Sequence, residues 1–196
     1  MTDIFNTLST VFGLMTPLVG IIAIFKGSYK PQRITRFVSI IVNSISFSSL
    51  LILQSSSIWL AIPQFFGSFA FFVLCFKYGI GGQTKRDWVV FGLALALIIF
   101  RLSGVDTQTG LLLAICISAL GNSVSALKCY RQPYTESELF YFTDVVSAIF
   151  SLLAIFVIGE FGFWILLYPM YILLNNGLCL GLIELGRRKK LKTKTP

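Results

Sequence analysis

The 196-residue sequence contains no histidine, only 8 acidic residues and no Cys-x-x-Cys pair. Without histidine, the side chain that most often acts as a general base is missing, and the common Cys/His metal sites are excluded. Charged residues make up 12% of the chain, whereas soluble domains contain about 25%. These gaps argue against a soluble enzyme and against a metalloprotein. We therefore predict no enzymatic activity, no metal and no cofactor.

Cysteine is scarce as well, and its spacing suggests no chemistry. The four cysteines are Cys75, Cys116, Cys129 and Cys179. Three of them lie in apolar runs and Cys129 lies in a basic segment. We expect all four to be reduced thiols.

Hydrophobic residues, by contrast, make up 56% of the chain and gather in seven continuous runs. We place these runs at about 8–25, 37–54, 58–76, 88–104, 108–127, 139–157 and 162–184. A transmembrane helix takes about 20 residues, and a continuous run in hydrocarbon must be helical to satisfy its backbone polar groups. The N-terminus has no basic segment before the first run, so we expect that run to be a retained span rather than a cleaved signal peptide. The sequence therefore predicts an all-α polytopic membrane protein with seven transmembrane helices in a lipid bilayer.

The basic residues gather in alternate loops. Of the 16 lysines and arginines, all but Arg101 fall after the first, third and fifth runs or in the C-terminal tail. The loop after the first run is expected to hold Lys26, Lys30, Arg33 and Arg36. By the positive-inside rule these loops are cytoplasmic. This distribution of basic residues predicts an outer N-terminus and a cytoplasmic C-terminus, and it explains the net charge of +8 without a nucleic-acid partner. We expect the membrane to be a bacterial plasma membrane. The oligomeric state stays open.

Residues that are rare in apolar segments recur in the same order in both halves of the chain. Lys26, Pro31, Trp59 and Pro63 recur as Lys128, Pro133, Trp164 and Pro169, at offsets of 102, 102, 105 and 106. This order predicts two three-helix repeats joined by a linker helix. The two repeats are parallel, because the single linker helix returns the chain to the side of the membrane on which the first repeat began. The predicted units are repeat 1 at 1–80, the loop and linker helix at 81–105, repeat 2 at 106–186 and a basic cytoplasmic tail at 187–196. Parallel repeats place a pseudo-twofold axis along the membrane normal, and a cavity between the two halves.

This 3+1+3 plan resembles the SWEET sugar transporters, the wider PQ-loop group and the PnuC-type vitamin transporters. PQ-loop proteins usually carry Pro-Gln in the first helix of each repeat. Here Pro31-Gln32 lies in the first loop and Pro63-Gln64 in the third run. The resemblance implies a transporter or facilitator of a small polar solute, sugar-like or vitamin-like, that passes through a cavity between the repeats. The alternative is a non-transporting membrane receptor or assembly protein of the same plan.

Polar residues inside the apolar runs are the candidate functional residues, since a carboxylate at the centre of a span costs about 2.5–3.5 kcal/mol. The candidate solute-binding residues are Asp144, Asn122, Asn175, Asn176, Asn43 and Gln64. Two interpretations stay open for them. Asp144 is either a solute or coupling-ion ligand, or a carboxylate near the interface that water or a loop lysine reaches. The amides either line a polar pathway or hold the helices together. Pro63 and Pro169 are candidate hinges or static bends.

Overall fold

The structure is a computed structural model that describes residues 2–29, 31, 33–79 and 85–192, without the side chains at 86, 87, 124, 135, 191 and 192. Within these ranges every regular element is helical, which confirms the all-α fold class. The elements are α1 (Thr2–Phe25), α2 (Arg33–Ile52), α3 (Ile58–Tyr78), α4 (Lys85–Leu102), α5 (Thr107–Arg131), the short 3-10 helix η1 (Pro133–Thr135), α6 (Glu138–Ile158) and α7 (Phe163–Lys192).

Six of these helices, all except α4, are long and apolar enough to cross a membrane. The run expected at 88–104 corresponds to α4, whose apolar part, Trp88–Leu102, is shorter than the others. Large apolar side chains such as Leu18, Phe69 and Phe156 are exposed on the outside of the bundle. A bilayer would cover these side chains, so the helices have the length and the surface of an integral membrane protein.

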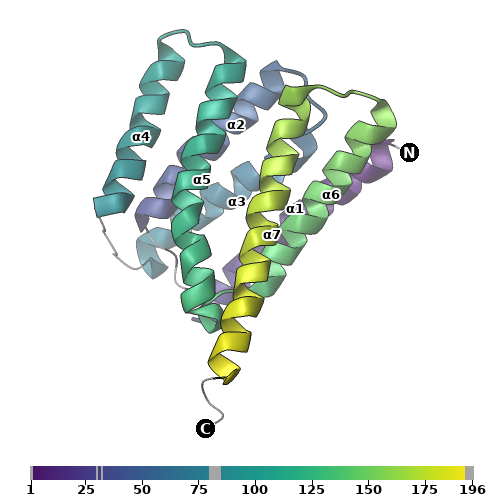
Figure 1. The fold of residues 1–196 in the computed structure, drawn as a ribbon. Helices are drawn as coiled ribbons and strands as arrows, with labels where there is room; N and C mark the ends of the chain where they lie inside the picture. Colours follow the sequence, from purple (N-terminus) through teal and green to yellow (C-terminus); the bar gives the residue numbers. More distant parts are fainter. Residues whose placement is uncertain (1, 30, 32, 80–84, 193–196) are drawn as a thin grey trace.

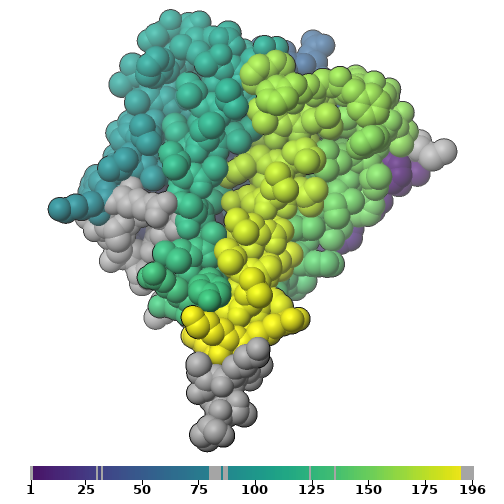
Figure 2. Space-filling model, viewed as in Figure 1, coloured from purple at the N-terminus to yellow at the C-terminus, as the bar shows by residue number. Residues whose placement is uncertain are grey.

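The helices form a bundle two layers deep in the view of Figure 1. Helices α4, α5, α7 and α6 lie in front, and α1, α2 and α3 lie behind them. The α4–α5 and α6–α7 connections are at the top of this view, and the C-terminus is at the bottom. Figure 2 shows that α4, α5, α7 and α6 together cover the near face.

The first three helices pack in the same way as the last three. Helix α3 packs against both α1 and α2, and helix α7 packs against both α5 and α6. Two further contacts join these triplets, because α1 packs against α6 and α2 packs against α5. Helix α4 lies against α2 and α5. The third helix of each triplet therefore separates the other two.

Local chemistry explains several helix ends. Asp106 precedes α5 and accepts a hydrogen bond from the Thr109 backbone N–H at 2.8 Å, which is the geometry of an N-cap. This hydrogen bond holds the pKa of the exposed Asp106 carboxyl below its ordinary value. Gly159 ends α6 with a left-handed backbone (φ 79°), a conformation that glycine adopts without steric cost. Asp106 therefore defines the start of α5, and Gly159 defines the end of α6.

The interface between α1 and α6 is closed by small polar pairs. Ser9 Oγ donates to the Ser147 carbonyl at 3.0 Å, and Ser147 Oγ donates to the Ser9 carbonyl at 2.5 Å. Further along the same interface, the hydroxyls of Thr16 and Thr143 lie 2.8 Å apart. Reciprocal hydrogen bonds of this kind stabilise helix pairs in apolar surroundings. The two serines therefore serve helix packing.

The basic segments meet at one end of the bundle. Lys128 Nζ lies 2.6 Å from Glu136 Oε1, and it also lies 5.6 Å from the centroid of the Tyr29 ring. Arg187 Nη1 lies 2.5 Å from Glu138 Oε1. Helix α7 continues to Lys192, so residues 187–192 of the tail expected at 187–196 are helical. We call this end, where the α1–α2 and α5–α6 connections meet the end of α7, the basic end.

Replacing Glu136 with glutamine should destabilise the protein by about 1.5–3 kcal/mol, because hydrogen bonds to charged groups contribute about that much. The Glu136 side chain is only 6% exposed, and its second oxygen accepts a hydrogen bond from the Tyr141 hydroxyl at 3.1 Å. Thermal unfolding in detergent measures the change. The control is Glu184→Gln, because Glu184 pairs with Arg188 on the exposed surface of α7 and such pairs contribute below about 1 kcal/mol. Equal melting temperatures for the two variants would contradict the prediction.

Candidate functional site

A polar cavity lies at the centre of the bundle, between the two helix triplets. It is lined from α1, α2, α3, α5, α6 and α7. The centres of water-sized molecules can reach about 100 Å³ of it, and one water needs about 10–15 Å³ of such space. The cavity therefore has room for several waters or for one small polar solute.

The structure brings all six candidate solute-binding residues into this one cavity. Its lining includes Asp144, Asn122, Asn175, Asn176, Asn43 and Gln64. They come from five helices that lie far apart in the sequence. Their convergence follows from the cost of polar groups against lipid, which favours an orientation toward the interior of the bundle.

Apolar clusters pack on both sides of the cavity along the helices. On the side away from the basic end, the cluster includes Leu60 of α3, Leu111 of α5 and Tyr168 of α7. On the side of the basic end, the cluster includes Cys129 of α5 and Ile183 of α7. The first cluster draws on both triplets, whereas the second lies on α5, α6 and α7 alone. All four cysteines are unpaired, as predicted.

Asp144 belongs to a hydrogen-bonded chain across three helices. Its side chain is buried on α6, and Gln64 Nε2 of α3 donates to Asp144 Oδ1 at 2.6 Å. Asn43 Nδ2 of α2 donates in turn to the Gln64 backbone carbonyl at 3.3 Å. Among the residues that the structure describes, no lysine or arginine forms an ion pair with Asp144. The Thr16 side chain of α1 also forms a hydrogen bond with Asp144, so the carboxyl group is positioned by an amide and a hydroxyl.

A second hydrogen-bonded group lies on α5 and α7. Asn122 Nδ2 donates to the Tyr171 hydroxyl at 2.8 Å, and this hydroxyl donates to Ser118 Oγ at 2.7 Å. All three residues line the cavity. The group therefore holds α5 to α7, and it also presents an amide oxygen and hydroxyls to an occupant.

The two adjacent asparagines of α7 both line the cavity, but in different ways. Asn176 is buried, and its Nδ2 donates to the Ile172 carbonyl of its own helix at 3.0 Å. Asn175 is half-buried. Because adjacent residues of a helix point about 100° apart, the two amides face different parts of the cavity.

Arg36 is a lining residue that the sequence analysis places in a loop. Helix α2 begins at Arg33, before the apolar run, so Arg36 lies one turn inside the helix. It lines the cavity together with Ser39 and Asn43, which follow it at i+3 and i+7 on the same helix face. This spacing is visible in the sequence and could have identified Arg36. Hydropathy alone does not place Arg36 inside a helix, because a charged residue at the edge of an apolar run marks the end of the run.

Pro63, one of the two candidate hinges, packs tightly against α1. A Cβ atom added at Gly13 of α1 would lie 2.5 Å from Pro63 Cγ, and one added at Gly67 of α3 would lie 2.9 Å from Pro17 Cβ. Each proline thus faces a glycine of the other helix. Pro63 and Pro17 also line the cavity. Pro169, the other candidate hinge, is fully buried and is not among the residues that line the cavity. At Pro63, α1 and α3 therefore cross at close range.

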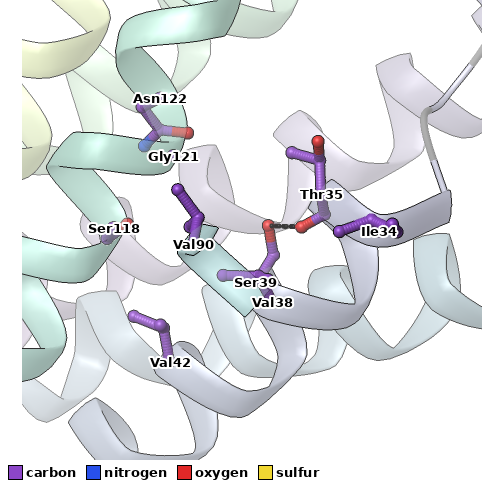
Figure 3. Close-up of a pocket in the computed structure, with 9 residues that line it drawn as sticks. All are labelled: Ile34, Thr35, Val38, Ser39, Val42, Val90, Ser118, Gly121 and Asn122. Carbon is purple, nitrogen blue, oxygen red and sulfur yellow. Dashed lines mark hydrogen bonds between the residues drawn. The ribbon is translucent and has the colours of Figure 1, made fainter. Parts of the chain in front are cut away.

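A narrow crevice branches from the cavity between α2 and α5. It shares Ser39, Ser118 and Asn122 with the cavity. Figure 3 shows Val90 of α4 between the α2 and α5 side chains, with the Ser39 hydroxyl bonded to the Thr35 carbonyl. The α2–α5 interface is therefore covered by α4, whereas the α1–α6 interface is closed by its own polar pairs.

No known protein family, characterised protein or solved structure matches this chain. The resemblance to the SWEET, PQ-loop and PnuC plans therefore stays a prediction. What the chain does has to be inferred from the cavity, its polar lining and the helices that enclose it.

Proposed function

We propose that this chain is a transporter or facilitator of a small polar solute, and that the central cavity is its solute-binding site. One observation carries the proposal. Side chains that are costly in a membrane converge from both helix triplets on one cavity. Packing alone would not require such a compartment, since apolar side chains could fill it.

We propose further that α1–α3 and α5–α7 are two parallel repeats and that α4 is the linker helix. The matching packing of α3 between α1 and α2, and of α7 between α5 and α6, supports this plan. The basic end is then cytoplasmic and the N-terminus lies outside. A solute site between two repeats is typical of transporters that expose the site to each side in turn.

In this mechanism the apolar clusters beside the cavity take part in gating. The cluster with Leu60, Leu111 and Tyr168 draws on both triplets and serves as the outer gate, and the cluster with Cys129 and Ile183 is the part of the cytoplasmic gate that α5–α7 supply. A movement of one triplet against the other opens one gate while the other stays closed. The cross-contacts α1–α6 and α2–α5 are where this movement takes place.

Replacing Ser118 with phenylalanine should reduce solute flux about tenfold or more, because the ring enters a cavity with room for only a few waters. The measurement is uptake of a panel of labelled sugars, amino acids and vitamins into liposomes that contain the purified protein. The matched control is Leu120→Phe, two positions along α5, where the side chain is exposed on the outside of the bundle. Both variants are first checked for melting temperature and monodispersity.

Flux of no solute above that of empty liposomes would contradict the transport proposal and favour the receptor or assembly alternative. Equal flux through Ser118→Phe and Leu120→Phe would leave a transporter but would contradict the assignment of this cavity as its site. A selective loss with Ser118→Phe supports both parts.

A further inference from the structure

Two opposite charges line the central cavity, and neither has a partner of opposite charge in the described part of the chain. Arg36 lines it from α2, and Asp144 lines it from α6. No ion pair joins either residue to another side chain of the described ranges. A charge inside a membrane protein is costly unless a partner compensates it. This arrangement therefore points to an occupant that supplies the missing charges.

The surroundings of Arg36 leave donors available to such an occupant. Its guanidinium carbon lies 4.7 Å from the centroid of the Phe71 ring and 5.5 Å from that of Tyr29, and its Nη2 donates to the Tyr29 hydroxyl. Its Nε is buried with no hydrogen-bond partner among the described residues. A guanidinium carries five N–H donors in a planar fork that matches the geometry of a carboxylate. The aromatic rings flank the guanidinium, and the Nε–H is a buried donor that no described residue uses.

The two charges lie at different depths in the cavity. From Arg36 to Asn43, α2 rises about 10 Å at about 1.5 Å per residue. Asn43 contacts the Gln64 backbone, and the Gln64 side chain binds Asp144. Toward the basic end, Arg36 lies over the Phe71 ring. The Phe71 ring in turn packs on the Phe140 ring, with 6.0 Å between the two ring centroids. Phe140 precedes Asp144 by one turn of α6. The carboxylate and the guanidinium are thus held apart by amides and aromatic rings.

We propose that the cavity binds a zwitterionic solute whose acidic and ammonium groups are separated by several bonds, with its carboxylate on Arg36 and its ammonium group on Asp144. This rests on the function proposed above and names the chemical class of its solute. Such a solute compensates both charges. A neutral solute compensates neither, and a simple anion leaves Asp144 without a counter-charge.

The test uses γ-aminobutyrate and ε-aminocaproate as zwitterionic probes, butyrate as a simple anion and glucose as a neutral solute. Binding to the purified full-length protein in detergent is measured by calorimetry and by the shift in melting temperature, since a ligand of the native state raises apparent stability. We expect the zwitterions to bind the wild type more tightly than butyrate or glucose.

Arg36→Gln should weaken zwitterion binding by about tenfold or more, the loss expected when a charge-assisted hydrogen bond is removed. Arg36→Lys should recover part of it. The matched control is Arg33→Gln, one turn earlier on α2, which removes an equal charge from the basic end but not from the described cavity lining. If Arg36 only held Tyr29 and Phe71 in place, Arg36→Gln would lower the melting temperature without changing the preference for zwitterions over glucose.

A wild type that binds none of the zwitterions, or that prefers glucose, would overturn this inference, and so would an unchanged preference in Arg36→Gln. Its failure is distinguishable from failure of the transport proposal, because binding in detergent requires no translocation. Zwitterion binding without flux into liposomes contradicts transport alone. Flux of glucose that is insensitive to Arg36→Gln contradicts the zwitterion site alone.

Discussion

Replacing Asp144 with asparagine should lower solute flux by about 10- to 100-fold while the protein stays folded. A hydrogen bond to a charged group contributes about 1.5–3 kcal/mol, and each 1.4 kcal/mol is a factor of ten. Asparagine keeps the shape of the side chain and still offers an oxygen to Gln64 Nε2, which donates to Asp144 Oδ1 at 2.6 Å in the wild type. What the variant loses is the negative charge toward an occupant, so we expect the loss in flux and in binding rather than in stability.

The measurement is initial uptake into liposomes at matched protein content, together with the melting temperature. Asp106→Asn is the control, because it removes an acidic charge from an exposed N-cap and asparagine is also a good N-cap residue. Wild-type flux in Asp144→Asn would show that this charge has no part in transport. A large fall in the melting temperature of ligand-free Asp144→Asn would instead show that Asp144 serves helix packing through Gln64.

The convergence of the candidate residues could be predicted in part because one physical rule acts on all of them. An Asn, Gln or Asp inside an apolar run cannot face lipid cheaply, so it turns to the interior of the bundle. The sequence identifies such residues one at a time. It does not say that Asn122 is bonded to Tyr171, or that Gln64 reaches Asp144, since those contacts depend on how α5 packs on α7 and α3 on α6.

Arg36 shows where the same reasoning fails. Hydropathy marks the end of a span where charges begin, but a helix does not end there. Helix α2 begins at Arg33, α1 begins at Thr2 and α7 continues to Lys192, each beyond its apolar run. A charge on these extensions faces either the aqueous surface or the interior, and only the position of the neighbouring helix decides between them. Arg36 faces the interior because Phe71 and Tyr29 receive its guanidinium.

The two triplets differ where the predicted repeat makes them look alike. Pro63 and Pro169 occupy matching positions in that predicted repeat. The close glycine contacts between α1 and α3 lie around Pro63, whereas α7 approaches α5 most closely at the basic end, where Gly186 faces the Tyr130 carbonyl. The predicted repeat therefore does not show where along each pair the two helices come closest.

Replacing Gly13 with valine should destabilise the protein by about 3 kcal/mol or more, and in the strongest case prevent it from accumulating. Overpacking a core typically costs about 1–3 kcal/mol and sometimes more. Here the added Cβ would lie 2.5 Å from Pro63 Cγ and 3.0 Å from Ser147 Oγ, so two neighbouring helices would have to move. Unfolding in detergent and yield from membranes measure the effect.

Gly177→Val is the matched control, since a Cβ atom added at this exposed position of α7 meets no atom within 4 Å. Valine is a somewhat better helix former than glycine, so this variant should be neutral or slightly stabilising. The crossing itself is tested by adding Pro63→Ala to Gly13→Val. If the two side chains compete for the same space, the second change should recover about 0.5–3 kcal/mol of the first, the range found for residues in contact. Strict additivity would mean that Gly13 and Pro63 act separately. The cavity beside this crossing would then not depend on how closely α1 approaches α3.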